Sequence, residues 1–223
     1  DSGGPIKVKW SHDDNIAISD LYWPTPILIP YEPLMTYGYK NFVIFPYEIN
    51  NYNDQNSFIE ANIDFLICDD ICVPEKALIK TNLNEIKNDA ELYDWFLKVP
   101  SQILPVRASL DSEFINIRFS WPFDVSSATF FIDNQEIIEH ASDQKLIKEE
   151  NIYLLKIKKL DDLKSFEYLS GVLTINDNES YIIDTEIENT TENSLSNVSY
   201  THHRDHETQF DLVCLLRLEQ GGG

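Results

Sequence analysis

The chain has few basic residues, few cysteines and few glycines. Its 223 residues include 17 Lys and Arg against 38 Asp and Glu, which gives a formal net charge of −21. Nucleic-acid-binding proteins gain affinity from Lys and Arg that neutralise phosphates, and anionic membrane surfaces attract the same residues. The charge therefore argues against both kinds of partner, and we interpret the acidic excess as a solvated surface.

Long apolar runs and low-complexity stretches are missing as well. No segment approaches the roughly 18 to 20 apolar residues of a membrane span, and no signal peptide is visible. Seven glycines and ten prolines are too few for a low-complexity chain, whereas 43% hydrophobic and 12% aromatic residues suffice for packed cores. We expect a soluble, mature or trimmed chain with one large domain or two of about 100 residues each.

Two of the three cysteines, Cys68 and Cys72, lie four positions apart in the segment ICDDICVP, residues 67–74. Along a straight strand four positions span about 13 Å, whereas a disulfide needs Cα atoms about 5.5 Å apart. Asp69 and Asp70 are turn formers, so the chain can turn between the cysteines. This pattern predicts a closely spaced thiol pair at an exposed loop tip. Such a pair is more easily redox-active than structural, because a small ring constrains the unfolded chain little.

Alternating apolar and polar residues predict short strands in the first part of the chain. The candidates are residues 6–10, 16–18, 42–45, 47–49, 63–67 and 77–81. Residues 21–33 are rich in proline and aromatics, and proline removes ladder donors, so we expect an irregular crossing loop there. Gly38 would permit a backbone turn between the rings of Tyr37 and Tyr39.

One helix and a second set of strands follow. Asn88 can cap the helix, Glu91 completes a capping box, and Pro100 ends the pattern. The later strand candidates recur at a spacing typical of a sandwich; they are residues 106–110, 114–119, 128–132, 152–158, 168–174 and 181–185. The pattern predicts two all-β units joined by a helix, with the boundary near residues 98–104.

The C-terminal part does not continue this pattern. From about residue 188 the composition becomes that of a linker, rich in Asn, Thr, Ser and Glu. Residues 202–223 contain three histidines, a short apolar run and Cys214, the third cysteine. The spacing of these histidines and the cysteine matches no defined zinc site, so we expect a disordered or artificial tail and no metal site.

Three segments, in order, resemble the periplasmic N-terminal region of DsbD-type protein-disulfide reductases, and most closely the ScsB-like branch. They are Trp23-Pro24, Tyr37-Gly38-Tyr39 and the C-x-x-x-C-V-P motif of residues 68–74. The second half is similar at residues 130–133 and 169–173, so the resemblance spans roughly residues 1–188.

The resemblance implies an all-β fold with two immunoglobulin-like β-sandwich domains joined by a short helix. Residues 1–98 would form the redox-active sandwich, whose opening strands are expected to be missing, and residues 104–188 the second sandwich. Residues 189–223 would be a linker or disordered tail.

The resemblance also assigns roles to individual residues. Cys72 would form a mixed disulfide with a partner and Cys68 would resolve it. Tyr37, Gly38 and Tyr39 correspond to a cap that covers the cysteines, although ordinary packing of the two tyrosines on a sheet stays open. The turn that supports the cysteines would consist of Asp69, Asp70 and Pro74. Because the two aspartates lie between the sulfurs, we expect thiol pKa values at or above about 8.5.

The implied function is a periplasmic dithiol–disulfide exchange module of a DsbD/ScsB-like reductase, within a full-length protein of the inner membrane. Electrons would arrive from the membrane conduit and thioredoxin-like domain of that protein and leave to oxidised thioredoxin-fold partners, with no cofactor. The alternative is a non-catalytic immunoglobulin-like extracytoplasmic binding module in which the disulfide is structural.

Overall fold

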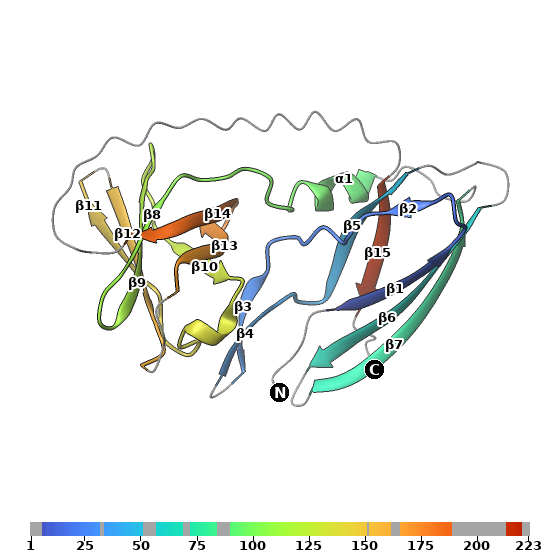
Figure 1. The fold of residues 1–223 in the computed structure, drawn as a ribbon, viewed down its shortest axis with the longest axis horizontal. Helices are drawn as coiled ribbons and strands as arrows, with labels where there is room; N and C mark the ends of the chain where they lie inside the picture. The colour runs from blue at the N-terminus through green and yellow to red at the C-terminus, as the bar shows by residue number, and fades with distance from the viewer. Residues whose placement is uncertain are drawn as a thin grey trace. The chain divides into compact units, whose positions relative to one another are not determined.

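A computed structural model of the chain describes residues 6–31, 34–50, 57–68, 72–83, 90–150, 152–161, 166–188 and 213–219 (Figure 1). Strands account for most of these residues and helix for very few, so the all-β prediction is confirmed. The chain divides into two compact units, one formed by residues 1–99 and 210–223 and the other by residues 100–209. In the described part of the chain, no helix has the length and apolar character needed to cross a membrane.

The first unit contains three small sheets. Their orders are β1-β6-β7, β15-β5-β2 and β3-β4. The elements are β1 (Lys7–His12), β2 (Ala17–Ile18), β3 (Ile27–Tyr31), β4 (Leu34–Gly38), β5 (Phe42–Asn50), β6 (Phe58–Cys68), β7 (Cys72–Asn82), α1 (Ala90–Phe96) and β15 (Val213–Glu219).

The core of this unit lies between β5 and one face of the β1-β6-β7 sheet. Along β6 the residues Ile59, Ala61 and Ile63 are buried, and Asn62 and Asp64 between and beyond them are exposed. This period of two is what a strand with one covered face requires. Phe45 of β5 is fully buried and belongs to the same core.

Two features of the first unit differ from expectation. Residues 27–31 form a strand inside the proline-rich segment that we expected to be an irregular loop. Pro30 is tolerated there because, among the described strands, β3 pairs with β4 alone, so one side of the strand needs no donor. Gly38 ends β4 without a left-handed backbone, and the residue with positive φ after it is Asn41, at 67°.

The C-terminal segment also differs, because residues 213–219 form strand β15 and not a disordered tail. β15 pairs antiparallel with β5, with Cys214 opposite Tyr47. A short apolar run of this kind can add to a free sheet edge through its backbone alone. The rest of the predicted tail, including its three histidines, lies outside the described residues.

The second unit contains one seven-stranded sheet in the order β10-β13-β14-β8-β9-β12-β11. The elements are β8 (Arg107–Leu110), β9 (Phe114–Ser120), β10 (Ala128–Ile132), the short 3₁₀ helix η2 (Gln135–Ile137), β11 (Lys145–Glu149), β12 (Ile152–Lys158), β13 (Tyr168–Ile175) and β14 (Glu179–Glu188). The sequence pattern did not predict β11, because four of its five residues are exposed and only Leu146 is partly covered.

Gly171 explains how β13 packs so closely against β10. Its φ is +156°, and a Cβ atom built on it would lie 2.3 Å from the carbonyl oxygen of Phe131. The same Cβ would lie 2.8 Å from the ring of Phe130, which is fully buried. Only glycine fits this position without moving backbone.

Candidate redox site

The two cysteines meet at the end of the hairpin formed by β6 and β7. The antiparallel register runs from Phe58 opposite Asn82 to Cys68 opposite Cys72. Cys72 is half-buried and disulfide-bonded. The register therefore places Cys68 directly opposite Cys72, whose sulfur is part of a disulfide. Asp69 and Asp70, which we expected to form the turn, lie outside the described residues.

The cysteine end of the hairpin extends beyond the core of the unit. Ile63 is the last fully buried residue of β6, and residues 65–67 are only partly covered. On β7 Val73 is 42% exposed, and Pro74, Glu75 and Lys76 are exposed as well. Figure 1 shows β6 and β7 running side by side to this end. The described residues at this end of the hairpin are thus exposed or only partly covered.

Pro74 sits where a sheet accepts proline. β7 is an edge strand, because the sheet order is β1-β6-β7. Edge strands tolerate a residue without an N–H, and proline also discourages unwanted pairing with another chain. Pro74 lies opposite Leu66 and Val73 opposite Ile67, so two apolar pairs separate the cysteines from the charged part of the hairpin.

The lysine of β7 closest in sequence to the cysteines has a carboxylate partner. The Nζ atom of Lys76 lies 2.8 Å from Oδ1 of Asp64, directly across the hairpin. The hydrogen bond to Asp64, with its negative charge, raises the pKa of the Lys76 ammonium. The ammonium is thus already paired with a carboxylate in the structure.

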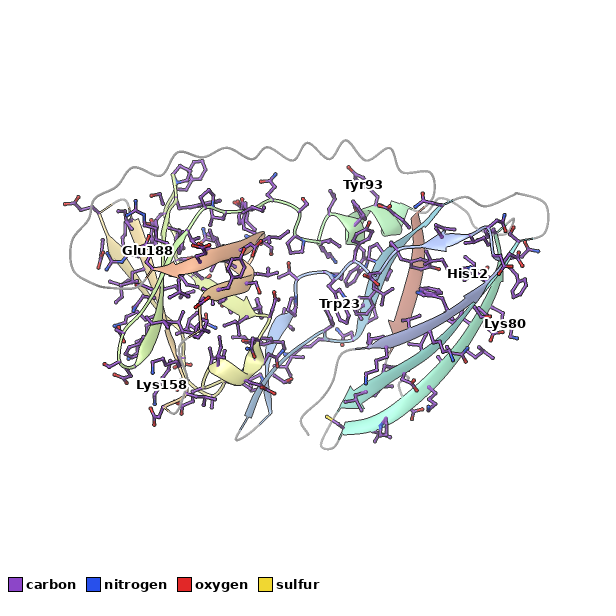
Figure 2. The ribbon with its side chains drawn as sticks, viewed as in Figure 1. His12, Trp23, Lys80, Tyr93, Lys158 and Glu188 are labelled. Atoms are coloured by element: carbon purple, nitrogen blue, oxygen red, sulfur yellow. The ribbon has the colours of Figure 1, made fainter. Side chains whose placement is uncertain are left out.

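The other two segments of the resemblance meet around Phe45. Its ring contacts Trp23 at a centroid distance of 5.0 Å and Tyr39 at 5.5 Å, both edge-on. The Tyr39 hydroxyl donates a 2.6 Å hydrogen bond to the carbonyl oxygen of Pro24. Burial raises the pKa of the Tyr39 phenol well above its usual range. Figure 2 shows Trp23 beside β5, the strand that contains Phe45.

These contacts distinguish the two tyrosines that we expected to form a cap. Tyr39 packs against the core of the first unit, which is the ordinary packing alternative. Tyr37 and Gly38 lie on β4, opposite Leu28 and Ile27 of β3. A shielding role for this segment stays a prediction.

Sequence reasoning did not identify Phe45 as the residue that joins these two segments. Its signal was only membership of an apolar strand, which many core residues share. The cross-strand pair of Asp64 and Lys76 could have been found, because a hairpin centred on residue 70 fixes every pairing along β6 and β7. In the described residues, no group of three or more His, Cys, Asp or Glu side chains could hold a metal ion.

Comparison with known proteins connects the first unit to a redox family. Residues 3–84 match the family described as "Thiol:disulfide interchange protein DsbD, N-terminal". The resemblance to DsbD-type proteins is confirmed. The match covers β1 to β7 and includes both Cys68 and Cys72. It supports a thiol:disulfide interchange module.

A solved structure is similar over most of the chain. It is the N-terminal periplasmic domain of ScsB from Proteus mirabilis, with a TM-score of 0.65 and 18% sequence identity. The similarity covers 83% of this chain and 78% of that one, so the two share a fold across both units. The comparison with curated proteins found no match.

Proposed function

We propose that this chain is a periplasmic dithiol–disulfide exchange module of a DsbD/ScsB-like protein-disulfide reductase. It passes reducing equivalents to oxidised thioredoxin-fold partners through Cys68 and Cys72. The observation that carries the proposal is a disulfide-bonded Cys72 with Cys68 directly across, at the accessible end of an edge hairpin. The family match to thiol:disulfide interchange proteins supports the chemistry, and the likeness to a periplasmic domain supports the location.

The exchange has two steps, each conserving atoms and charge. The Cys72 thiolate attacks one sulfur of the partner's disulfide, a mixed disulfide forms, and the other partner sulfur leaves as a thiolate that takes up a proton. The Cys68 thiol then loses its proton and its sulfur attacks Cys72. The partner departs as a dithiol, and Cys68 and Cys72 are left oxidised. Two electrons and two protons have moved to the partner, and the chemistry requires no metal or organic cofactor. Within the full-length protein, the membrane conduit and the thioredoxin-like domain would return Cys68 and Cys72 to the dithiol form.

The position of the cysteines favours exchange over a structural clamp. The loop from Cys68 to Cys72 holds five residues, and closing a loop of this size lowers the entropy of the unfolded chain by an amount worth only about 2 kcal/mol. The paired strands β6 and β7 and the buried side chains of β6 already fix the hairpin. A structural disulfide in a non-catalytic binding module is the alternative, and the trapping experiment below distinguishes the two.

Trapping of a mixed disulfide tests the proposal directly. Reduced Cys68→Ser protein is incubated with an oxidised thioredoxin-fold protein, and the products are separated under non-reducing conditions. We expect a covalent complex that a thiol reductant dissolves, because Cys72 attacks and Cys68, the proposed resolving cysteine, is replaced. The double variant Cys68→Ser/Cys72→Ser is the control and should form none.

Two results would change the assignment. A complex formed by Cys72→Ser but not by Cys68→Ser would exchange the roles of the two cysteines. If neither single variant forms a complex while both stay folded, the sulfurs are structural and the proposal is wrong.

We further propose that Tyr37 shields the cysteine pair, and alkylation of the reduced protein tests this. Tyr37→Ala should speed modification of Cys72 by a small alkylating reagent, because a covering ring has been removed. Tyr93→Ala is a matched control, since Tyr93 is 64% exposed on α1. Equal rates for all three proteins would end the cap proposal without affecting the exchange chemistry.

A further inference from the structure

One face of the β1-β6-β7 sheet points away from the core of the unit, and the cysteine pair lies at one end of this face. We call it the outer face; its residues are Lys7, Lys9 and Ser11 of β1, Glu60, Asn62, Asp64 and Leu66 of β6, and Pro74, Lys76, Leu78 and Lys80 of β7. The alternate residues of the same strands, such as Trp10 and Ile63, pack in the core of the unit. Most outer-face residues are exposed, and Leu78 is 55% exposed.

The outer face is basic in a chain that is strongly acidic. It contains four lysines and two carboxylates, whereas the whole chain carries a net charge of −21. Seven basic residues precede residue 100: Lys7, Lys9, Lys40, Lys76, Lys80, Lys87 and Lys98. Four of these seven therefore lie on one sheet face. Figure 2 shows Lys80 at the outer margin of β7.

Two of the four lysines have carboxylate partners in the structure. Lys76 pairs with Asp64, and Lys80 pairs with Glu60. Among the residues that the structure describes, Lys7 and Lys9 form no ion pair. The face thus carries two more lysines than carboxylates, and the two lysines without an ion pair lie on β1, beside the ion pairs of β6 and β7.

A partner bound at the cysteines is large enough to contact the lysines of β7 as well. Lys76 is four residues from Cys72 on the same strand, about 13 Å away, and Lys80 is about 26 Å away. A standard interface covers about 800 Å² on each partner, a patch about 28 Å across. Leu66 and Pro74 form the apolar row between the cysteines and the first charged row. An apolar centre beside a charged rim is the usual arrangement of a protein interface.

We propose that the outer face docks an acidic surface of a thioredoxin-fold partner and thereby guides that partner's disulfide to Cys72. The inference rests on the proposed exchange function and adds the chemistry by which a partner is selected. Opposite charges steer association and raise its rate, most strongly at low salt. An anionic membrane is the less favourable occupant, because this face ends at Cys68 and Cys72, which a protein disulfide can react with and a lipid surface cannot.

The rate of exchange measures this docking. The reduced full chain is mixed with an oxidised thioredoxin-fold protein of net negative charge, and the second-order rate constant is followed from low to high ionic strength. For Lys7→Glu/Lys9→Glu we expect the rate constant to be about tenfold lower than that of the natural chain at low salt. At about 1 M salt, where the screening length is about 3 Å, the two proteins should react at the same rate. The matched control Lys40→Glu/Lys145→Glu changes the net charge equally on residues outside this face and should change the rate less than twofold.

Two further reactants separate the possible failures. An uncharged small disulfide, 2-hydroxyethyl disulfide, should react at the same rate with all three proteins. If the natural chain reacts neither with this reagent nor with the acidic partner, the exchange function itself is contradicted.

A partner whose surface carboxylates near its cysteines are replaced by lysine should react faster with Lys7→Glu/Lys9→Glu than with the natural sequence. Equal rates across all variants with the acidic partner would overturn the docking inference and leave the exchange function standing. Binding of the natural chain, but not of Lys7→Glu/Lys9→Glu, to vesicles that contain phosphatidylglycerol would also overturn it, in favour of a membrane.

Discussion

Two long hairpins of this chain end in different ways. The β13–β14 hairpin lies inside the seven-stranded sheet, where β14 is followed by β8, and its turn is held by a side chain. The β6–β7 hairpin ends at an edge strand, and a cysteine pair faces across its last register position.

The first of these hairpins shows how a turn is fixed without a covalent bond. Asn176 has φ of 52°, and its Oδ1 atom accepts a 2.8 Å hydrogen bond from the backbone N–H of Ser126. Its Nδ2 group donates to the carbonyl oxygen of Asp124 at 3.1 Å. The turn is thereby tied to the segment before β10. Because one hairpin of this chain closes without a covalent bond, we predict that the disulfide at the other hairpin serves exchange and contributes little to closure.

The largest effect on stability is expected at the close approach of β13 to β10. Gly171→Ala should lower the free energy of unfolding by about 3 kcal/mol, because its Cβ meets the carbonyl of Phe131. Denaturant unfolding measures the change. The neighbouring Ser170→Ala should change it by less than about 0.5 kcal/mol. A mild effect of Gly171→Ala would mean that β13 and β10 can separate, and the fixed register between these two strands would be in doubt.

The turn of the β13–β14 hairpin should come next. Asn176→Ala removes the bonds to Ser126 and Asp124 and replaces Asn, which tolerates positive φ, by Ala, which tolerates it less well, so we expect the free energy of unfolding to fall by about 2 kcal/mol. Asn176→Gly removes the same hydrogen bonds but adopts positive φ without strain, so its free energy of unfolding should fall by about half as much. Chemical unfolding of both variants separates the two contributions. If the two variants unfold alike, the backbone conformation contributes nothing at this turn.

The cysteine pair should contribute no more than that turn. Cys68→Ser/Cys72→Ser should lower the free energy of unfolding by at most about 2 kcal/mol, the limit set by a five-residue loop. Reduction of the natural chain should have the same effect within about 0.5 kcal/mol. Loss of the folded state on reduction would reverse the comparison and favour a structural disulfide.

The smallest effect is expected on the pH dependence of unfolding, through one carboxylate of the second unit. Partial burial would raise the pKa of Asp111, but hydrogen bonds from the Asn116 side chain and from the backbone of Glu113 and Phe114 outweigh it, and the pKa is lowered. A lowered folded pKa contributes stability that is present above the unfolded value of about 3.9 and is lost as pH falls through the folded pKa. Unfolding measured between pH 7 and about pH 2 should show a smaller acid-dependent loss in Asp111→Asn. An unchanged profile would mean that this carboxylate does not stabilise the β8–β9 turn.

The sequence predicted the fold where side-chain period and composition decide the structure. The alternation around Ile63 and the apolar runs of β9 and β12 identified strands that the structure contains. The prolines of residues 21–33 predict a loop where the structure contains β3, because a strand at a sheet edge tolerates proline. The sequence pattern does not predict β11, because four of its five residues are exposed and no buried face imposes a period of two.

The candidate site was predictable to a similar extent. The spacing of Cys68 and Cys72 with turn formers between them indicated that the chain brings them together, and the register does so. The contact of Tyr39 with Pro24 and Phe45 joins residues distant in sequence, and no local pattern reports such packing. The same holds for the basic outer face, since Lys7 and Lys76 become neighbours of Asp64 only through the pairing of three strands.

The reduction potential of the natural chain tests most directly whether its cysteines exchange or only hold a bend. It is obtained from the oxidised fraction at equilibrium with a series of dithiol–disulfide buffers. Exchange predicts a value of about −180 to −270 mV, as for known thiol–disulfide carriers. A value below about −300 mV would identify a structural bond and contradict the account.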